Sequence, residues 1–212
     1  KLPLGEYDIA QLAYSIERED LGMAGGKQDQ YAATFGGVNF MEFYANNKVI
    51  VNPLRIKQEW LNELEMNLIL FYTQTSRKSS NIIAIQAENV ETKKEKPIRA
   101  MHQLKEQAFG MKEALLKGEL SQIGQLLDTS WQHKKNMAEG ISNNQIDAIY
   151  SAVMKAGALG GKMSGAGGGG FMIFFAEPEA NLTVKKALAE FNGTITRFEF
   201  CNEGLTTWTI NE

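Results

Sequence analysis

The stretch Gly160–Phe175, GGKMSGAGGGGFMIFF, decides how this chain is interpreted, because a run rich in glycine leads directly into an apolar, aromatic strand. Glycine loses more backbone freedom on ordering than any other residue, so a glycine-dense loop carries an entropic penalty. Chains accept that penalty where backbone N–H groups must approach a ligand closely, and phosphate is the commonest such ligand. The run predicts either a phosphate-binding loop or a glycine-rich connection that packs under a helix without a ligand.

Two familiar phosphate motifs do not fit this loop. Gly165, Gly167 and Gly170 satisfy the G-x-G-x-x-G spacing, but the dinucleotide fingerprint needs a strand before it and a helix after it. Here a helical pattern precedes the loop and the strand Phe171–Phe175 follows it. A P-loop fails as well, because Met163 stands where that motif needs Ser or Thr.

The composition excludes several classes of protein. The chain has 212 residues, 43% hydrophobic and 22% charged, which are ordinary globular values. A net charge of −3 with mixed signs argues against a nucleic-acid partner. Because no apolar run reaches transmembrane length, we expect no membrane partner. Cys201 is the only cysteine, which excludes an intrachain disulfide, fits a reducing, cytoplasmic setting and, with only His102 and His133, disfavours zinc.

Apolar periodicity divides the chain into a short first part and a longer, mainly helical second part. The spacing predicts a helix over residues 7–19 that ends near Gly22, and strands over residues 31–51 with a turn at Asn46-Asn47. The next elements expected are a strand at 68–72 and helices at 98–115 and 120–131. A third helix is expected to begin at Ser142, which would form a capping box with Gln145. After it we expect a strand at 171–175, a helix near 180–191, and strands at 194–201 and 205–210. This order predicts an α+β sandwich with helices on one side of a sheet.

Two segments resemble motifs of the GHMP kinase superfamily, which includes galactokinases, homoserine kinases and mevalonate kinases. Residues 17–37, EREDLGMAGGKQDQYAATFGG, resemble its second motif, and residues 160–175 resemble its third. The residues of these motifs most resemble those of the bacterial D-glycero-D-manno-heptose 7-phosphate kinases, and they are also similar to those of L-fucose kinases. The first motif, Pro-x-x-x-Gly-Leu-Gly-Ser-Ser, which wraps the ATP phosphates in relatives, is absent from this sequence.

The resemblance implies the C-terminal part of a two-domain fold. Residues 1–56 would be the tail of a nucleotide-binding domain of the ribosomal-protein-S5-like type. Residues 57–212 would form the GHMP kinase C-terminal domain, a ferredoxin-like α+β sandwich. Since the first motif is missing, we expect this chain by itself to bind ATP poorly and to be inactive.

The resemblance also assigns roles around the second motif. Asp29 would be the catalytic aspartate, which accepts or orients the proton of the acceptor hydroxyl, with Lys27 keeping it ionised and Gln30 contacting the substrate. An Asx-turn is the structural alternative for Asp29. Glu17 corresponds to the magnesium-binding glutamate, with Glu19 as a competitor and a solvated helix face as the alternative for both.

Phosphate contacts are expected from the glycine loop and from one polar run. By resemblance, the loop residues that bind the ATP phosphates are Ser164, Gly165, Gly167, Gly168 and Gly169. In the run of residues 73–80, Arg77 could hold the phosphate of an anionic sugar substrate, because Arg suits bidentate phosphate contacts. A solvated polar turn explains that run equally well.

The resemblance implies a sugar kinase that uses ATP and Mg²⁺. It would transfer the γ-phosphoryl group to a hydroxyl, the anomeric one, of heptose 7-phosphate or a related sugar. Its partner would be that small molecule, and a homodimer is left open. The alternatives are a non-catalytic module that senses sugar and nucleotide, another kinase of the superfamily such as L-fucose kinase, and a decarboxylase that uses ATP on a mevalonate-type acid. Asp29 argues against a pure sensor, and the decarboxylase would need more basic groups near Asp29 than Lys27.

Overall fold

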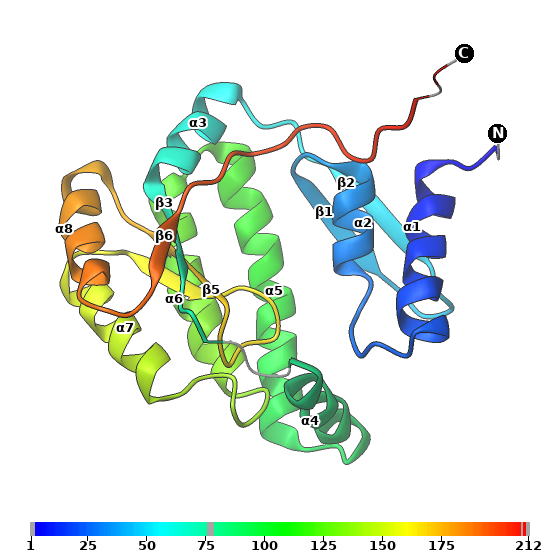
Figure 1. Cartoon of the computed structure of the whole chain (residues 1–212), viewed down its shortest axis with the longest axis horizontal. Helices are drawn as coiled ribbons and strands as arrows, with labels where there is room; N and C mark the ends of the chain where they lie inside the picture. The colour runs from blue at the N-terminus through cyan, green and yellow to red at the C-terminus, as the bar shows by residue number, and fades with distance from the viewer. Residues whose placement is uncertain (1–2, 76–78, 209, 211–212) are drawn as a thin grey trace. The chain divides into compact units, whose positions relative to one another are not determined.

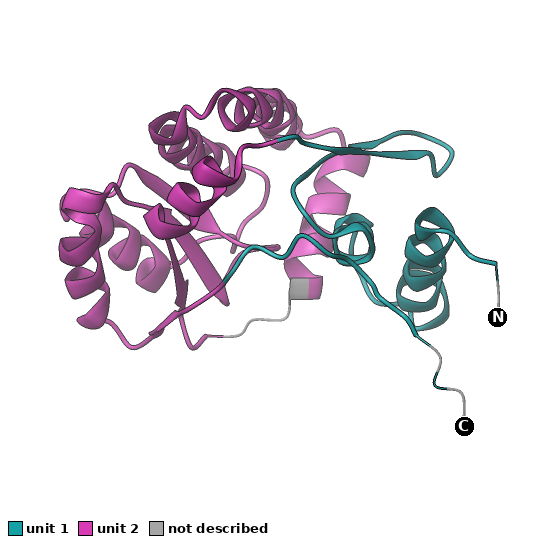
Figure 2. Cartoon of the chain, turned by 90° about the horizontal axis from the view of Figure 1, so that it is seen from above, with its two compact units in different colours: residues 1–55, 199–212 teal, residues 56–198 magenta. Residues whose placement is uncertain are grey.

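The computed structural model describes residues 3–75, 79–208 and 210, which form two compact units (Figures 1 and 2). The first unit is Lys1–Arg55 with Glu199–Glu212, and the second is Ile56–Phe198. The division falls beside the expected boundary at residue 56. The last residues, 199–212, belong to the first unit, whereas the sequence analysis assigns them to the second domain.

The first unit combines helices with one hairpin. Its elements are α1 (Glu6–Tyr14), the π-helical turn η1 (Ser15–Asp20), α2 (Gln28–Phe35), β1 (Asn39–Phe43) and β2 (Val49–Pro53). The strands β1 and β2 pair antiparallel. The turn between them has φ values of 58° at Asn46 and 60° at Asn47, a conformation that Asn tolerates better than most residues. The helix predicted over residues 7–19 is therefore present, but its last turn is π-helical.

The strand predicted to begin at Tyr31 is wrong, because residues 28–35 form the helix α2. Tyr, Thr and Phe in this segment have high strand propensity. Tertiary packing decides otherwise, since Tyr31 is buried against Ala10 of α1 and Val51 of β2. Helical periodicity places Tyr31 and Thr34 on the buried side of α2, while Asp29 remains exposed.

The C-terminal segment joins the first unit through backbone hydrogen bonds and is not a strand. The Gly37 N–H donates to the Cys201 carbonyl over 2.8 Å, and the Leu205 N–H donates to the Thr34 carbonyl over 3.1 Å. The strand expected at residues 205–210 is wrong for the part of that range that the structure describes. These hydrogen bonds attach the segment to the end of α2 and to the residues just after it, not to a sheet.

The second unit contains four strands and six helices among its described residues. The elements are α3 (Gln58–Asn67), β3 (Leu68–Tyr72), α4 (Ser79–Glu91), α5 (Glu95–Lys117), α6 (Leu120–Lys135), α7 (Asn144–Lys155), β4 (Gly160–Met163), β5 (Phe171–Phe175), α8 (Pro178–Ala189) and β6 (Thr194–Thr196). The sheet order is β4-β5-β3-β6, and every neighbouring pair is antiparallel. This is the strand arrangement of a ferredoxin-like sandwich, with four helices between its first two strands. The predicted α+β class is confirmed.

The core of the second unit lies between one face of the sheet and helices α6, α7 and α8. Alternate residues of a strand share a face, and the register places Ile69 opposite Phe174 and Phe71 opposite Met172. All four side chains are buried. The helices contribute Trp131 from α6, Ile146, Ile149 and Val153 from α7, and Val184 and Leu188 from α8.

Several local predictions in this unit need correction. The cap of α7 is Asn143 and not Ser142, because the Asn143 Oδ1 accepts from the Ile146 N–H over 3.0 Å, whereas Ser142 donates to Asp147. The helix α4 was not predicted. The strand β6 covers only the first three residues of the strand expected at 194–201.

The first two glycines of the glycine run lie in the strand β4 rather than in a loop. A Cβ on Gly160 would come 2.0 Å from the Gly124 carbonyl oxygen of α6, and one on Gly161 would come 2.3 Å from the Phe174 ring. These glycines therefore serve close packing of the strand against α6 and β5. Only the glycines from Gly165 onward belong to the loop.

Candidate functional site

Glu17 lies on a π-helical turn, a rare conformation that is often found at functional sites. The Leu21 N–H donates to the Ile16 carbonyl over 3.0 Å, which is the i→i−5 spacing of that turn. The widened turn ends α1 and leads into the loop that carries residues 21–27. Sequence periodicity predicted helix here but gave no sign of the widened turn.

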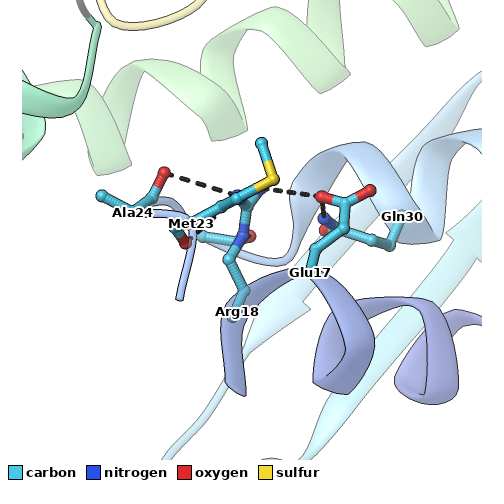
Figure 3. Close-up of polar contacts among 6 residues, drawn as sticks. Glu17, Arg18, Met23, Ala24 and Gln30 are labelled. Carbon is cyan, nitrogen blue, oxygen red and sulfur yellow. Dashed lines mark hydrogen bonds and ion pairs between the residues drawn. The ribbon is translucent and has the colours of Figure 1, made fainter. Parts of the chain in front are cut away.

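The carboxylate of Glu17 is held through one of its two oxygens (Figure 3). The Gln30 Nε2 donates to Oε2 of Glu17 over 2.6 Å, and the Arg18 guanidinium lies 3.4 Å from the same oxygen. Gln30 is 5% exposed, while the Glu17 side chain is 43% exposed. Within the described residues, Oε1 of Glu17 has no hydrogen-bond partner. One oxygen of the carboxylate is thus held in place, and the other is left without a hydrogen-bond partner among the described residues.

Arg18 shapes the loop between η1 and α2, a role that the sequence analysis missed. Its Nε donates to the Gly26 carbonyl over 3.1 Å, and its NH1 donates to the carbonyls of Met23 and Ala24 over 3.4 Å each. A Cβ on Gly25 would come 2.6 Å from the guanidinium carbon, so a larger residue there would displace the Arg18 guanidinium from its present position. The sequence signal for this contact was Arg18 between Glu17 and Glu19, followed by the pair Gly25-Gly26.

Lys27 and Asp29 occupy the start of α2 but do not pair with each other among the described residues. Asp29 is exposed in the first turn of the helix, where acidic side chains are favoured. The Lys27 ammonium instead donates to Asn47 over 2.8 Å and to Gln11 over 3.4 Å, and lies 4.4 Å from the centre of the Tyr14 ring. A catalytic role for either residue, and a substrate contact for Gln30, stay predictions.

In the second unit, the glycine loop between β4 and β5 folds back on the chain through its own backbone. The N–H groups of Ser164, Gly168 and Gly170 donate to the carbonyls of Phe171, Ile141 and Thr75, each over 2.8 Å. In this conformation the N–H groups of Ser164 and Gly168 are therefore occupied. Within the described residues, those of Gly165, Gly167 and Gly169 have no hydrogen-bond partner.

Glycine is required at two positions of the loop by both conformation and space. Gly167 has a φ of 111°, and a Cβ there would come 2.8 Å from the Ile141 carbonyl oxygen. Gly169 has a φ of 157°, and its Cβ would come 2.5 Å from the Thr75 carbonyl oxygen. Gly165, with a φ of 70°, has open space around the position of a Cβ and is exposed. The loop thus packs tightly at its base and is open at Gly165.

A buried lysine lies beneath the loop, and the sequence analysis missed it. Lys134 of α6 is 9% exposed, and its ammonium donates to the Met163 carbonyl over 3.2 Å and to the Gly165 carbonyl. Burial, assisted by the charge of Lys162, lowers the pKa of Lys134 to about 8. The available signal was spacing, because Lys134 continues the stripe of buried residues through Leu127 and Trp131.

Arg77 is the last of the predicted site residues. Arg77 lies outside the described residues. Throughout the described part of the chain, no group of three or more His, Cys, Asp and Glu side chains is placed to hold a metal ion. None of the helices in that part combines the length and the apolar character that a membrane span requires.

Comparison with known proteins identifies a family domain within the second unit. Residues 111–193 match the family of GHMP kinases, C terminal. The chain contains a GHMP kinase C-terminal domain. This domain includes α6, α7, the glycine loop and β5, and therefore both Lys134 and the carbonyls that it holds.

Individual relatives of the chain include sugar kinases. The chain is 49% identical to the D-glycero-alpha-D-manno-heptose 7-phosphate kinase of Campylobacter jejuni over 99% of the chain and 61% of that protein. It is 28% identical to L-fucokinase/L-fucose-1-P guanylyltransferase of Bacteroides fragilis over 86% of the chain and 19% of that protein. A crystal structure of a D-glycero-D-manno-heptose 1-phosphate kinase from Bacteroides thetaiotaomicron matches with a TM-score of 0.76 and 39% identity, over 100% of this chain and 57% of that one. The chain thus spans about three fifths of the heptose-phosphate kinases that it matches.

Proposed function

We propose that this chain is part of a sugar kinase that transfers the γ-phosphoryl group of ATP to a hydroxyl of a heptose phosphate. The observation that carries the proposal is the 49% identity, over 99% of the chain, with a kinase of heptose 7-phosphate. An alignment of that extent includes both the segment around Asp29 and the glycine loop. The identity of 28% with a fucokinase makes L-fucose the weaker alternative as acceptor.

Asp29 is the group that we assign to the acceptor hydroxyl. Its carboxylate is exposed at the start of α2, so a sugar can reach it. Phosphoryl transfer to an alcohol needs a group that accepts or orients the hydroxyl proton, together with accurate positioning. Lys27 lies two residues away and would contribute through its contacts with Asn47 and Gln11, which fix the start of the helix.

Glu17 fits a role in magnesium binding. Mg²⁺ usually binds one or two carboxylates together with substrate phosphates and water. Gln30 and Arg18 fix Oε2 of Glu17, and the side chain is open enough for Oε1 to meet a cation. When bound, the ion would offset the negative charge of the nucleotide phosphates. Glu19 is exposed and remains the alternative ligand.

The glycine loop is assigned to the nucleotide phosphates. The N–H groups of Gly165, Gly167 and Gly169 and the exposed hydroxyl of Ser164 are the donors that we propose. Gly168 would contribute through its small size, because its N–H is used by Ile141. A glycine backbone suits this role because no Cβ blocks the approach of a phosphate.

A coupled assay of ADP release on the complete gene product tests the function. The acceptors to compare are heptose 7-phosphate, heptose 1-phosphate, L-fucose and mevalonate, with Asp29→Asn as the blank. We expect turnover on heptose 7-phosphate with phosphorylation at the anomeric carbon, which phosphorus NMR of the product identifies. Preference for another acceptor would overturn the substrate assignment, and binding of sugar and nucleotide without turnover would favour the sensing module.

A further inference from the structure

Lys134 reaches the glycine loop from below and binds the backbone at its entrance. Its ammonium donates to the carbonyl of Met163, the last residue of β4, and to that of Gly165, the second residue of the loop. An ammonium offers three donors, so these two bonds use most of its capacity. A side chain on a rigid helix therefore fixes the direction of the Gly165 carbonyl.

The direction of this carbonyl sets the direction of the next N–H group. A trans peptide is planar, and its C=O and N–H point to opposite sides; no cis peptide occurs among the described residues. Because Lys134 holds the Gly165 carbonyl toward α6, the Ala166 N–H must point away from α6. Within the described residues this N–H has no hydrogen-bond partner.

The same geometry recurs at the other end of the loop. The Asn143 Nδ2 donates to the Gly168 carbonyl over 3.3 Å, which turns the Gly169 N–H to the opposite side of that peptide. Asn143 also caps α7 through its Oδ1, so its side chain is fixed at both ends. Two side chains outside the loop thus orient two backbone donors within it.

The charge of Lys134 is not needed for packing. Its position on the buried stripe of α6 would suit an apolar residue, and a buried ammonium without an ion pair is unfavourable. Among the described residues no ion pair involves Lys134, and the nearby charge of Lys162 has the same sign. A cation kept under a loop with oriented N–H donors adds to their attraction for an anion.

We propose that Lys134 is a positioning residue for the nucleotide phosphates, which orients the Ala166 N–H toward them, while Asn143 orients that of Gly169. The proposal rests on the proposed function, because it takes the loop to bind a nucleotide phosphate. It assigns to Ala166 a backbone donor that the glycine pattern does not reveal. It also gives Lys134 a role in nucleotide binding and not in contact with the sugar.

The test compares four variants of the complete gene product in ATP binding and in steady-state kinetics. Lys134→Met removes the ammonium at similar size, Lys134→Arg retains a cation, and Asn143→Ser keeps a cap for α7 but is too short to reach Gly168. Lys185→Met removes an exposed lysine of α8 as the matched control. Calorimetry with ATP needs no sugar, so it measures how the Lys134 substitutions change ATP affinity even if the acceptor assignment is wrong.

We expect Lys134→Met to raise the Kd and the KM for ATP about tenfold or more, while the KM for the sugar phosphate stays within twofold. Lys134→Arg should recover part of the loss, Asn143→Ser should weaken ATP severalfold, and Lys185→Met should match wild type. A folded Lys134→Met variant with wild-type ATP binding would overturn the proposal. If that variant does not fold, wild-type ATP binding by Lys134→Arg and Asn143→Ser together would overturn it as well. Absence of turnover on every sugar in the wild type, with ATP binding that still depends on Lys134, would overturn only the proposed acceptor.

Discussion

The side-chain amide of Gln30 donates to Oε2 of Glu17 over 2.6 Å and ties the first turn of α2 to the π-helical end of α1. A hydrogen bond to a carboxylate is about twice as strong as one between neutral groups. Gln30 is buried, and its Oε1 has no hydrogen-bond partner among the described residues. Gln30 therefore orients Glu17.

Gln30→Met should weaken magnesium activation. The variant removes the donor at nearly constant volume, so Oε2 of Glu17 loses its fixed partner and the carboxylate gains rotational freedom. We expect the Mg²⁺ concentration for half-maximal activity of the complete gene product to rise severalfold. Gln28→Met, at an exposed position of the same helix, is the control. An unchanged magnesium titration would show that Glu17 does not bind the metal or that Gln30 does not orient Glu17 for it.

Asp29→Ala should abolish most of the turnover and spare nucleotide binding. Loss of a proton-accepting group typically lowers the rate about a hundredfold or more. Because Asp29 is exposed, the substitution should leave the melting temperature almost unchanged. Asp20→Ala, an exposed carboxylate of η1, is the matched control, and a kcat near wild type for Asp29→Ala would show the assignment to be wrong.

Alanine substitutions should distinguish the packed base of the glycine loop from its open part. Gly167→Ala would place a Cβ 2.8 Å from the Ile141 carbonyl oxygen, whereas Gly165→Ala meets nothing within 4 Å. Both positions have a positive φ, so each alanine should lower the free energy of unfolding by about 1–2 kcal/mol through that conformation alone. Gly167→Ala should lose about 1–3 kcal/mol more through overpacking. Denaturant unfolding of both variants measures the difference, and equal losses would mean that the loop relaxes without strain.

Local sequence patterns were sufficient for the elements whose own periodicity agrees with their tertiary environment. The long helix that ends at Gly118, with its φ of 72°, and the strand Phe171–Phe175 were predicted for the right reasons. Residues 28–35 were not, because their strand propensity is overridden by the burial of Tyr31 against Ala10. The glycine pair Gly160-Gly161 could not be recognised as a strand, since Gly160 lets α6 approach and Gly161 leaves room for the Phe174 ring of β5.

The residues of the candidate site fall into the same two groups, those that the sequence predicts and those that only the fold reveals. The loop glycines and the Asp29 segment could be found from sequence because they carry their signal in consecutive residues. The burial of Lys134 follows from its spacing on α6, but the roles of Lys134 and Asn143 could not be predicted, because both side chains act on backbone atoms that are distant in sequence. Lys134 meets Gly165 only after α6 has packed beside β4. Such contacts require the fold to be known.

Lys134 should make the stability of the protein rise at alkaline pH. Burial lowers its pKa from 10.5 to about 8, so between these values the unfolded chain binds more protons at this residue than the folded chain does. The free energy of unfolding must then increase with pH through that window. A shift of that size corresponds to a gain on the order of 3 kcal/mol, because one pKa unit is worth about 1.4 kcal/mol.

The measurement is urea unfolding of wild type and Lys134→Met at pH 7, 8, 9 and 10. Other lysines and tyrosines titrate in the same range, so the quantity of interest is the difference between the two proteins at each pH. That difference should move in favour of the wild type as Lys134 loses its proton in the folded state. Lys185→Met, which removes an exposed lysine, should stay parallel to wild type at every pH. If Lys134→Met also stays parallel, the ammonium is not held in the buried, carbonyl-bound position beneath the loop, and the orientation of the Ala166 N–H would lose its cause.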